Sequence, residues 1–215
     1  HFTCTMKKGL NIIKHRYRNE LSGSIGHRFL FDYVLSAANR WKGGRIGDFT
    51  LELDFGDFEE FNVNTTFFST TDNWFCKENC KMEIRSDDLP PYMEPNLYCI
   101  LRDGLLVFKQ RDFEPNGDLQ VISYSMLSGI VSFDYRTNWL KYPIDLMDYF
   151  DNPIDEESKR ILKNLPFARR GYVFKTDYIQ KYFEGLNWYV PHKDYLPKMN
   201  SLTPKEQEWV ARWSK

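Results

Sequence analysis

Apolar and polar residues alternate with a period of two from Phe2 to about Met126. In residues 49–55 every odd position is apolar and every even position is polar, and residues 29–35 and 80–84 repeat the pattern. Successive side chains of a strand point to opposite faces, so this pattern predicts strands with one face on a core and the other in water. Short strands separated by turn residues favour an antiparallel, β-sandwich-like domain.

One pair of residues gives the strongest turn signal of the chain. Asp103-Gly104 separates two stretches that begin with apolar residues, 97–102 and 105–110. An Asp-Gly pair tolerates the positive φ angles of a two-residue turn, so the sequence predicts a β-hairpin here.

After Pro143 the periodicity becomes helical. Asn152 suits the N-cap position, Pro153 suits the first helical position, and Pro166 predicts the end of this helix. A second helix is predicted over residues 177–184, between Thr176 as cap and Gly185 just beyond the end.

The run Thr203-Pro204-Lys205-Glu206 has the sequence of a capping box, with proline at the first helical position. It predicts the start of a last helix. The fold class is therefore α+β, with a sandwich-like domain over residues 1–142 and a small helical module over residues 143–215.

Composition and charge narrow the class of protein. With 42% hydrophobic and 17% aromatic residues, the chain is expected to fold rather than stay disordered. A formal charge of −1 gives no general attraction to nucleic acid, and no apolar run approaches the roughly 18 to 20 residues that cross a bilayer. We expect neither a nucleic-acid partner nor a membrane span. The chain starts at His1 without a signal sequence, so we expect that an upstream part is missing.

The four cysteines are Cys4, Cys76, Cys80 and Cys99. Their even number permits disulfides, and Cys76 and Cys80 could bond if the residues between them form a turn, although a straight strand would separate their sulfurs too far. The alternative is buried free thiols. Zinc is less favoured because C-x2-C and H-x3-H spacings are missing, and neither a metal nor a cofactor is predicted.

Aromatic residues and arginines concentrate in residues 161–191, ILKNLPFARRGYVFKTDYIQKYFEGLNWYVP. The run 167–171, Phe-Ala-Arg-Arg-Gly, resembles the YARHG domain of exported bacterial proteins, whose namesake run is Tyr-Ala-Arg-His-Gly. Phe167 replaces the tyrosine and Arg170 replaces the histidine, so no role of that hydroxyl or imidazole is carried over. The resemblance implies an extracellular, periplasmic or cell-envelope location.

The N-terminal part also resembles an exported bacterial family of unknown function. The resemblance rests on KHRYR at residues 14–18, FLFDYVLSAANRW at 29–41, IGDFTLELDFG at 46–56 and DFEPNGDL at 112–119. These motifs imply no chemistry.

Flat aromatic faces stack on sugar or peptide surfaces, and guanidinium groups pair with carboxylates. This chemistry predicts that one set of residues, here called the arginine–aromatic cluster, binds an anionic cell-wall ligand: Arg169, Arg170, Tyr172, Trp188, Tyr189 and His192. The alternative is that the rings are the core of a very small module and that the arginines bond carbonyls at helix ends.

The sequence predicts no catalytic residue, since it lacks the spacing of a nucleophile elbow, a P-loop or a dinucleotide fingerprint. The favoured function is a non-catalytic exported bacterial protein that binds peptidoglycan, another glycan or an envelope protein. The alternatives are a hydrolase of envelope material with unidentified catalytic residues, and a purely structural protein of two domains.

Overall fold

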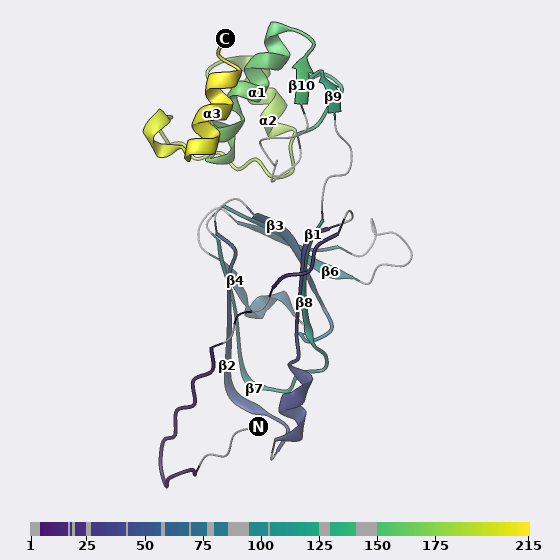
Figure 1. Ribbon diagram of the computed structural model, residues 1–215, viewed down its shortest axis with the longest axis vertical. Coiled ribbons are helices and arrows are strands. Elements are labelled where there is room, and N and C mark those ends of the chain that lie inside the picture. Colours follow the sequence, from purple (N-terminus) through teal and green to yellow (C-terminus); the bar gives the residue numbers. More distant parts are fainter. Residues whose placement is uncertain are drawn as a thin grey trace.

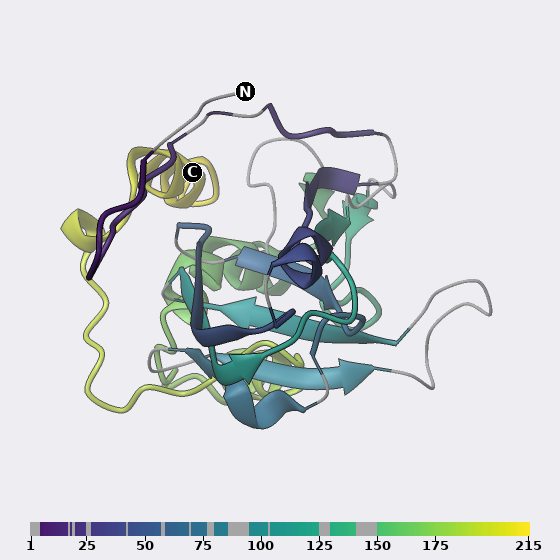
Figure 2. The same cartoon turned by 90° about the horizontal axis from the view of Figure 1, so that it is seen from below.

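The computed structural model describes residues 5–16, 18, 20–24, 27–41, 43–56, 59–68, 70–76, 80–85, 95–102, 104–124, 130–140 and 150–215. A strand-rich part precedes a helical part, which lies at one end of the strands (Figure 1). Residues 5–16 belong to no strand or helix, and they run along the outside of the sheets (Figures 1 and 2). Residues 1–4, which include Cys4, lie outside the described residues.

Two antiparallel sheets form the N-terminal part. The five-stranded sheet has the order β1 (His27–Tyr33), β8 (Leu119–Tyr124), β3 (Glu59–Asn64), β6 (Asn96–Leu101), β5 (Lys81–Arg85). The three-stranded sheet has the order β2 (Ile46–Asp54), β7 (Leu105–Phe113), β4 (Trp74–Cys76). Short 3₁₀ helices cover Ser36–Arg40 and Thr71–Asn73.

Aromatic rings fill the core between the two sheets. Phe61 of β3 and Phe108 of β7 are fully buried there, together with Phe67 and Phe113. Along β2, Leu53 is buried while Glu52 is exposed, as the period of two predicts. The predicted α+β class, with antiparallel sheets followed by helices, is confirmed.

The hairpin predicted at Asp103-Gly104 is wrong. Strand β6 pairs with β3 and β5 in one sheet, whereas β7 pairs with β2 and β4 in the other. The chain therefore crosses between sheets at this point. Glycine is required at position 104 because the chain passes close to residues 55 and 56. The carbonyl oxygen of Gly104 accepts from the amide of Phe55 at 2.9 Å, and a side chain at Gly104 would collide with the backbone of Gly56.

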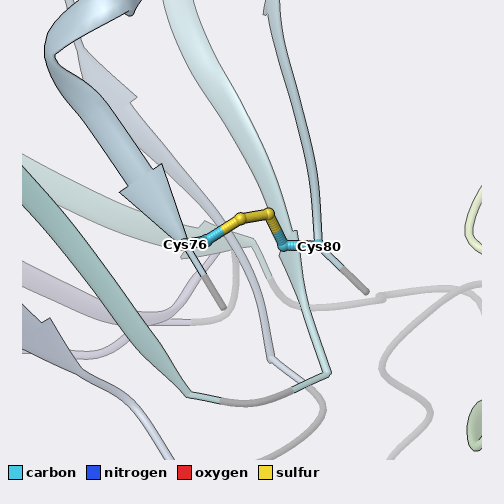
Figure 3. Close-up of a disulfide and its surroundings, with 2 residues drawn as sticks. All are labelled: Cys76 and Cys80. Carbon is cyan, nitrogen blue, oxygen red and sulfur yellow. A yellow bond between two sulfur atoms is a disulfide. The ribbon is translucent and has the colours of Figure 1, made fainter. Parts of the chain in front are cut away.

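A disulfide joins Cys76 and Cys80, whose Cα atoms are 6.3 Å apart (Figure 3). Cys76 ends β4, the edge of the three-stranded sheet, and Cys80 directly precedes β5, the edge of the five-stranded sheet. The bond thus joins the two sheets at their edges. Cys99 is a buried free thiol, and burial raises the pKa of this thiol well above its ordinary range. Both alternatives for the cysteines therefore occur in one chain.

Removing this disulfide is expected to lower the free energy of unfolding by about 2 kcal/mol, because closing so short a loop removes only a small entropy from the unfolded chain. Urea unfolding of the Cys76→Ser/Cys80→Ser variant would measure the change. A reductant should shift the parent by the same amount and leave the variant unchanged; a parent insensitive to reductant would contradict the structural role.

The helices lie in the C-terminal part with a small parallel strand pair. They are α1 (Glu156–Arg169), α2 (Asp177–Glu184) and α3 (Pro204–Arg212), with a 3₁₀ turn over Met199–Ser201. The strands are β9 (Ile130–Phe133) and β10 (Phe150–Pro153). We call the described residues 130–140 and 150–215 the helical module, because Phe133 and Leu140 are buried in the same core as the helices. The predicted domain division between residues 142 and 143 stays a prediction.

Helix α1 begins and ends later than predicted. Asp155, not Asn152, is the N-cap, and its carboxylate accepts from the amide of Ser158 at 2.7 Å, while Pro153 ends β10. Pro166 lies inside the helix. A proline has no amide for the carbonyl four residues earlier, and that carbonyl, of Leu162, instead accepts from the indole of Trp209 at 2.6 Å. The hydrogen bond from Trp209 thus replaces the one that Pro166 cannot donate.

The other two helices follow their local signals. Helix α2 spans the predicted residues 177–184. The capping box at the start of α3 is formed in both directions, between Thr203 and Glu206. Gly185 follows α2 as predicted. Its φ of −73° lies in the right-handed region, which other residues also adopt, so the backbone conformation does not require glycine here.

The helical module packs directly on the five-stranded sheet. Tyr98 and Ile100 of β6 belong to the core of the module, while Leu97, Cys99 and Leu101 of the same strand belong to the core between the sheets. From the turn after β6, the guanidinium of Arg102 donates to the carbonyl of Val190 at 2.8 Å and, more weakly, to that of Arg170 at 3.4 Å. Strand β6 therefore serves both cores.

Candidate functional site

A largely buried ion pair joins two helices of the helical module. Arg170 follows the last turn of α1, and Glu206 lies in the first turn of α3. Two parallel hydrogen bonds of 2.8 Å join the guanidinium to the carboxylate. The side chains are 13% and 3% exposed. Arg170 also donates to the carbonyl of Pro166 at 2.8 Å, so one side chain ties α3 to the end of α1.

Several groups hold the Glu206 carboxylate in its charged form. Burial raises the pKa of Glu206, but hydrogen bonds from Arg170 and from the amide of Thr203, with the charges of Arg170 and Arg169, outweigh burial. The pKa therefore lies below the ordinary value of 4.5. Arg169 is 7% exposed, and its Nη1 lies 4.0 Å from the carboxylate.

Gly171, the glycine of the 167–171 run, has a backbone that only glycine adopts readily. Its φ is +80°, and a side chain there would press on the carbonyl of Val190 and lie 2.8 Å from the amide nitrogen of His192. That amide donates to the carbonyl of Gly171 at 2.8 Å. The close approach joins the end of α1 to residues 190–192.

The aromatic members of the arginine–aromatic cluster use their polar atoms inside the module. Trp188 is 4% exposed and Tyr189 is 8% exposed. The indole of Trp188 donates to the carbonyl of Leu140 at 2.8 Å, and the hydroxyl of Tyr189 donates to the carbonyl of Tyr172 at 2.7 Å. Tyr172 and His192 are half-buried.

The structure therefore brings the arginine–aromatic cluster together in one module, but it turns most of the cluster inward. Arg169, Trp188 and Tyr189 are buried, and Arg170 is nearly so. Ligand binding by these six residues, with Tyr172 and His192 the most accessible to solvent, stays a prediction.

Trp139 is a candidate that sequence reasoning missed. Its side chain is 60% exposed, yet the backbone on both sides is fixed from within the module. The hydroxyl of Tyr182 donates to the carbonyl of Asn138 and accepts from the amide of Leu140, each at 3.0 Å. Trp188 holds the carbonyl of Leu140. No periodic pattern surrounds Trp139, so its only signal in the sequence is the residue type.

A cavity of about 340 Å³ lies beside Trp139, between the helical module and the five-stranded sheet. The module contributes Trp139, Leu140, Gly185, Leu186 and Asn187; the sheet contributes Glu60, Arg85 and Tyr98. We call this cavity the Trp139 pocket. It combines an aromatic surface with a carboxylate, a guanidinium and an amide, which is the usual composition of a small-ligand site.

The sheet side of the Trp139 pocket is ordered by Tyr98. Its hydroxyl donates to the Glu60 carboxylate at 2.5 Å, and the guanidinium of Arg85 lies 3.3 Å from the centre of its ring. Burial raises the pKa of Tyr98, and the nearby charge of Glu60 raises it further. Tyr98 therefore stays a protonated donor that orients the carboxylate.

The family comparison covers the C-terminal third of the chain. Residues 145–215 match the YARHG domain. The match includes the Arg170–Glu206 pair, Gly171 and all of α1, α2 and α3, so the resemblance in residues 161–191 is confirmed. The YARHG domain is generally found in extracellular or periplasmic proteins. No curated protein and no solved structure matches the chain.

Trp139 and the sheet residues of its pocket precede the segment that matches the YARHG domain. Within the described residues, no helix is long and apolar enough to cross a membrane. In that same part of the chain, no group of three His, Cys, Asp or Glu side chains is placed to hold a metal ion.

Proposed function

We propose that this is a non-catalytic, exported bacterial protein that binds cell-wall material at the cell envelope. The location is supported by the YARHG domain over residues 145–215. It is also supported by the Cys76–Cys80 disulfide, since such bonds persist in oxidising compartments and are rare in the cytosol.

The observation that carries the binding role is Trp139. The side chain of Trp139 is 60% exposed, so much of its apolar surface remains in water. The backbone beside it is nevertheless held in place by hydrogen bonds to the buried side chains of Tyr182 and Trp188. Such a fixed, solvent-facing ring is ready to contact a partner at little cost in entropy. In this proposal Tyr172 and His192 extend the binding surface, whereas Arg169 and Arg170 hold the module together.

The alternative of a hydrolase finds less support at this pocket. Among the described residues that line it there is no His, Ser or Cys, and Glu60 is its single carboxylate. Hydrolysis of a glycan generally uses a pair of carboxyl groups, so the composition favours binding. The alternative of a structural protein is favoured by one observation, the sharing of β6 between the two cores.

Co-sedimentation with insoluble peptidoglycan tests the proposed function. We expect the folded protein to be retained in the pellet, and to be retained less by cellulose, an insoluble glycan without peptide or N-acyl groups. Circular dichroism would establish folding beforehand. If neither peptidoglycan nor whole envelopes retain the folded protein, cell-wall binding is contradicted and the structural role is favoured.

A further inference from the structure

We propose that the Trp139 pocket binds one sugar ring of an N-acylated glycan, with the ring stacked on the indole of Trp139. This inference rests on the proposed function and deepens it, because it names the site and the class of ligand. The site lies between the helical module and the five-stranded sheet, so both parts of the chain contribute to it.

One face of the Trp139 indole packs against the helical module. The indole lies nearly parallel to the ring of Tyr182, at 9° and 6.2 Å between ring centres. Near α2, a side chain at Gly185 would lie 2.9 Å from the Cζ3 atom of the indole. The absence of a side chain at Gly185 therefore lets the indole rest against the module. With one face backed in this way and 60% of the side chain exposed, the opposite face is available to a ligand.

The chemistry around that face suits a sugar. A pyranose ring presents an apolar face of C–H groups, which packs on an aromatic surface, and it carries hydroxyl and acylamino groups around its edge. Glu60 supplies acceptor oxygens, Arg85 supplies donors, and Asn187 supplies both. A carboxylate accepts hydrogen bonds at both of its oxygens, and the bond from Tyr98 fixes the orientation of Glu60 at the pocket.

The size and charge of the pocket define the ligand further. Its volume of about 340 Å³ lies at the lower end of the range for small-ligand sites, about 300–1,000 Å³. This volume favours one sugar unit over a long polymer. Glu60 and Arg85 contribute opposite charges, and Arg85 is also paired with Glu83 at 2.9 Å, so the pocket favours a neutral ring with polar substituents over an anionic group.

Isothermal titration with a soluble oligomer of N-acetylglucosamine tests the inference directly. We expect the parent to bind, and Trp139→Ala to bind at least tenfold more weakly. The matched control is Trp41→Ala, because Trp41 is 61% exposed and lies after the 3₁₀ helix of the N-terminal part. This variant should bind like the parent. Both replaced side chains are exposed, so both variants should fold.

The outcomes separate the inference from the proposed function. Equal binding of the oligomer by the parent and Trp139→Ala, or no binding by the parent, would overturn the inference, even if peptidoglycan still retains the protein. Binding of a peptidoglycan stem peptide in place of the sugar oligomer would also overturn it. Loss of oligomer binding in Trp139→Ala alone would support the pocket, even if insoluble peptidoglycan does not retain the protein, a result that would count against the proposed function only.

Discussion

Replacing Arg170 with alanine is expected to lower the free energy of unfolding by about 3–5 kcal/mol, because it leaves the buried carboxylate of Glu206 without its main partner. The pair forms two hydrogen bonds of 2.8 Å, and the Glu206 side chain is 3% exposed. The variant also loses the bond to the carbonyl of Pro166. Urea unfolding followed by circular dichroism measures the change.

The matched control is Lys181→Ala. It breaks an ion pair with Asp177 in the same module, but in this pair the side chains are 71% and 80% exposed. Exposed pairs contribute little, so its stability should equal that of the parent. Equal stability of Arg170→Ala and Lys181→Ala would contradict the role of the buried pair. Because Arg170 stabilises the module, an Arg169→Ala/Arg170→Ala variant would be destabilised. A loss of binding in that variant would therefore not show that the arginines contact a ligand.

The pair also sets a dependence of stability on pH. The pKa of Glu206 is lower in the folded protein than its ordinary value of 4.5, so its contribution is present above pH 4.5 and is lost as the pH falls through the lower, folded pKa. In Glu206→Gln the amide does not titrate. The stability difference between parent and Glu206→Gln should therefore shrink below pH 4.5; a constant difference down to pH 2 would contradict this assignment.

Replacing Gly171 with alanine is expected to lower the free energy of unfolding by at least about 2 kcal/mol, since strain at such a backbone position alone costs about 1–3 kcal/mol. The φ of +80° disfavours any side chain, and the new methyl group would also collide with the backbone of residues 190–192. The expected result is a lower urea midpoint and a weakened contact between α1 and residues 190–192.

Gly47→Ala is the control for this substitution. Gly47 lies in β2, has an ordinary φ, and has no neighbouring atom within 4 Å of the added methyl group. Alanine there should leave stability unchanged or raise it slightly. If Gly171→Ala were as stable as Gly47→Ala, the glycine of the 167–171 run would have no structural requirement.

The sequence predicted the elements whose signals are local. Helix α2 has its predicted residues and α3 its capping box because the groups that bound them are neighbours in the chain. The error at Pro166 has the opposite cause. The donor that compensates for the missing amide is Trp209, which belongs to another helix and gives no sign of this role in the sequence.

Long-range pairing explains the other differences. Asp103-Gly104 indicates a turn, but the choice of sheet for β6 and β7 depends on partners elsewhere in the chain. The residues of the arginine–aromatic cluster are close together in the sequence and lie in one module, whereas the direction of each polar atom depends on packing. The Trp139 pocket could not be predicted because its residues come from five separate segments of the chain.

The sharing of β6 has a mechanical consequence. This strand lies inside the five-stranded sheet, between β3 and β5, while Tyr98 and Ile100 on its other face are embedded in the helical module. If the module is bound to a cell wall, tension on it reaches an interior strand through the packed side chains of Tyr98 and Ile100. The load then falls on the hydrogen bonds of β6 to both neighbouring strands, so the sheet resists it with two rows of bonds in place of one.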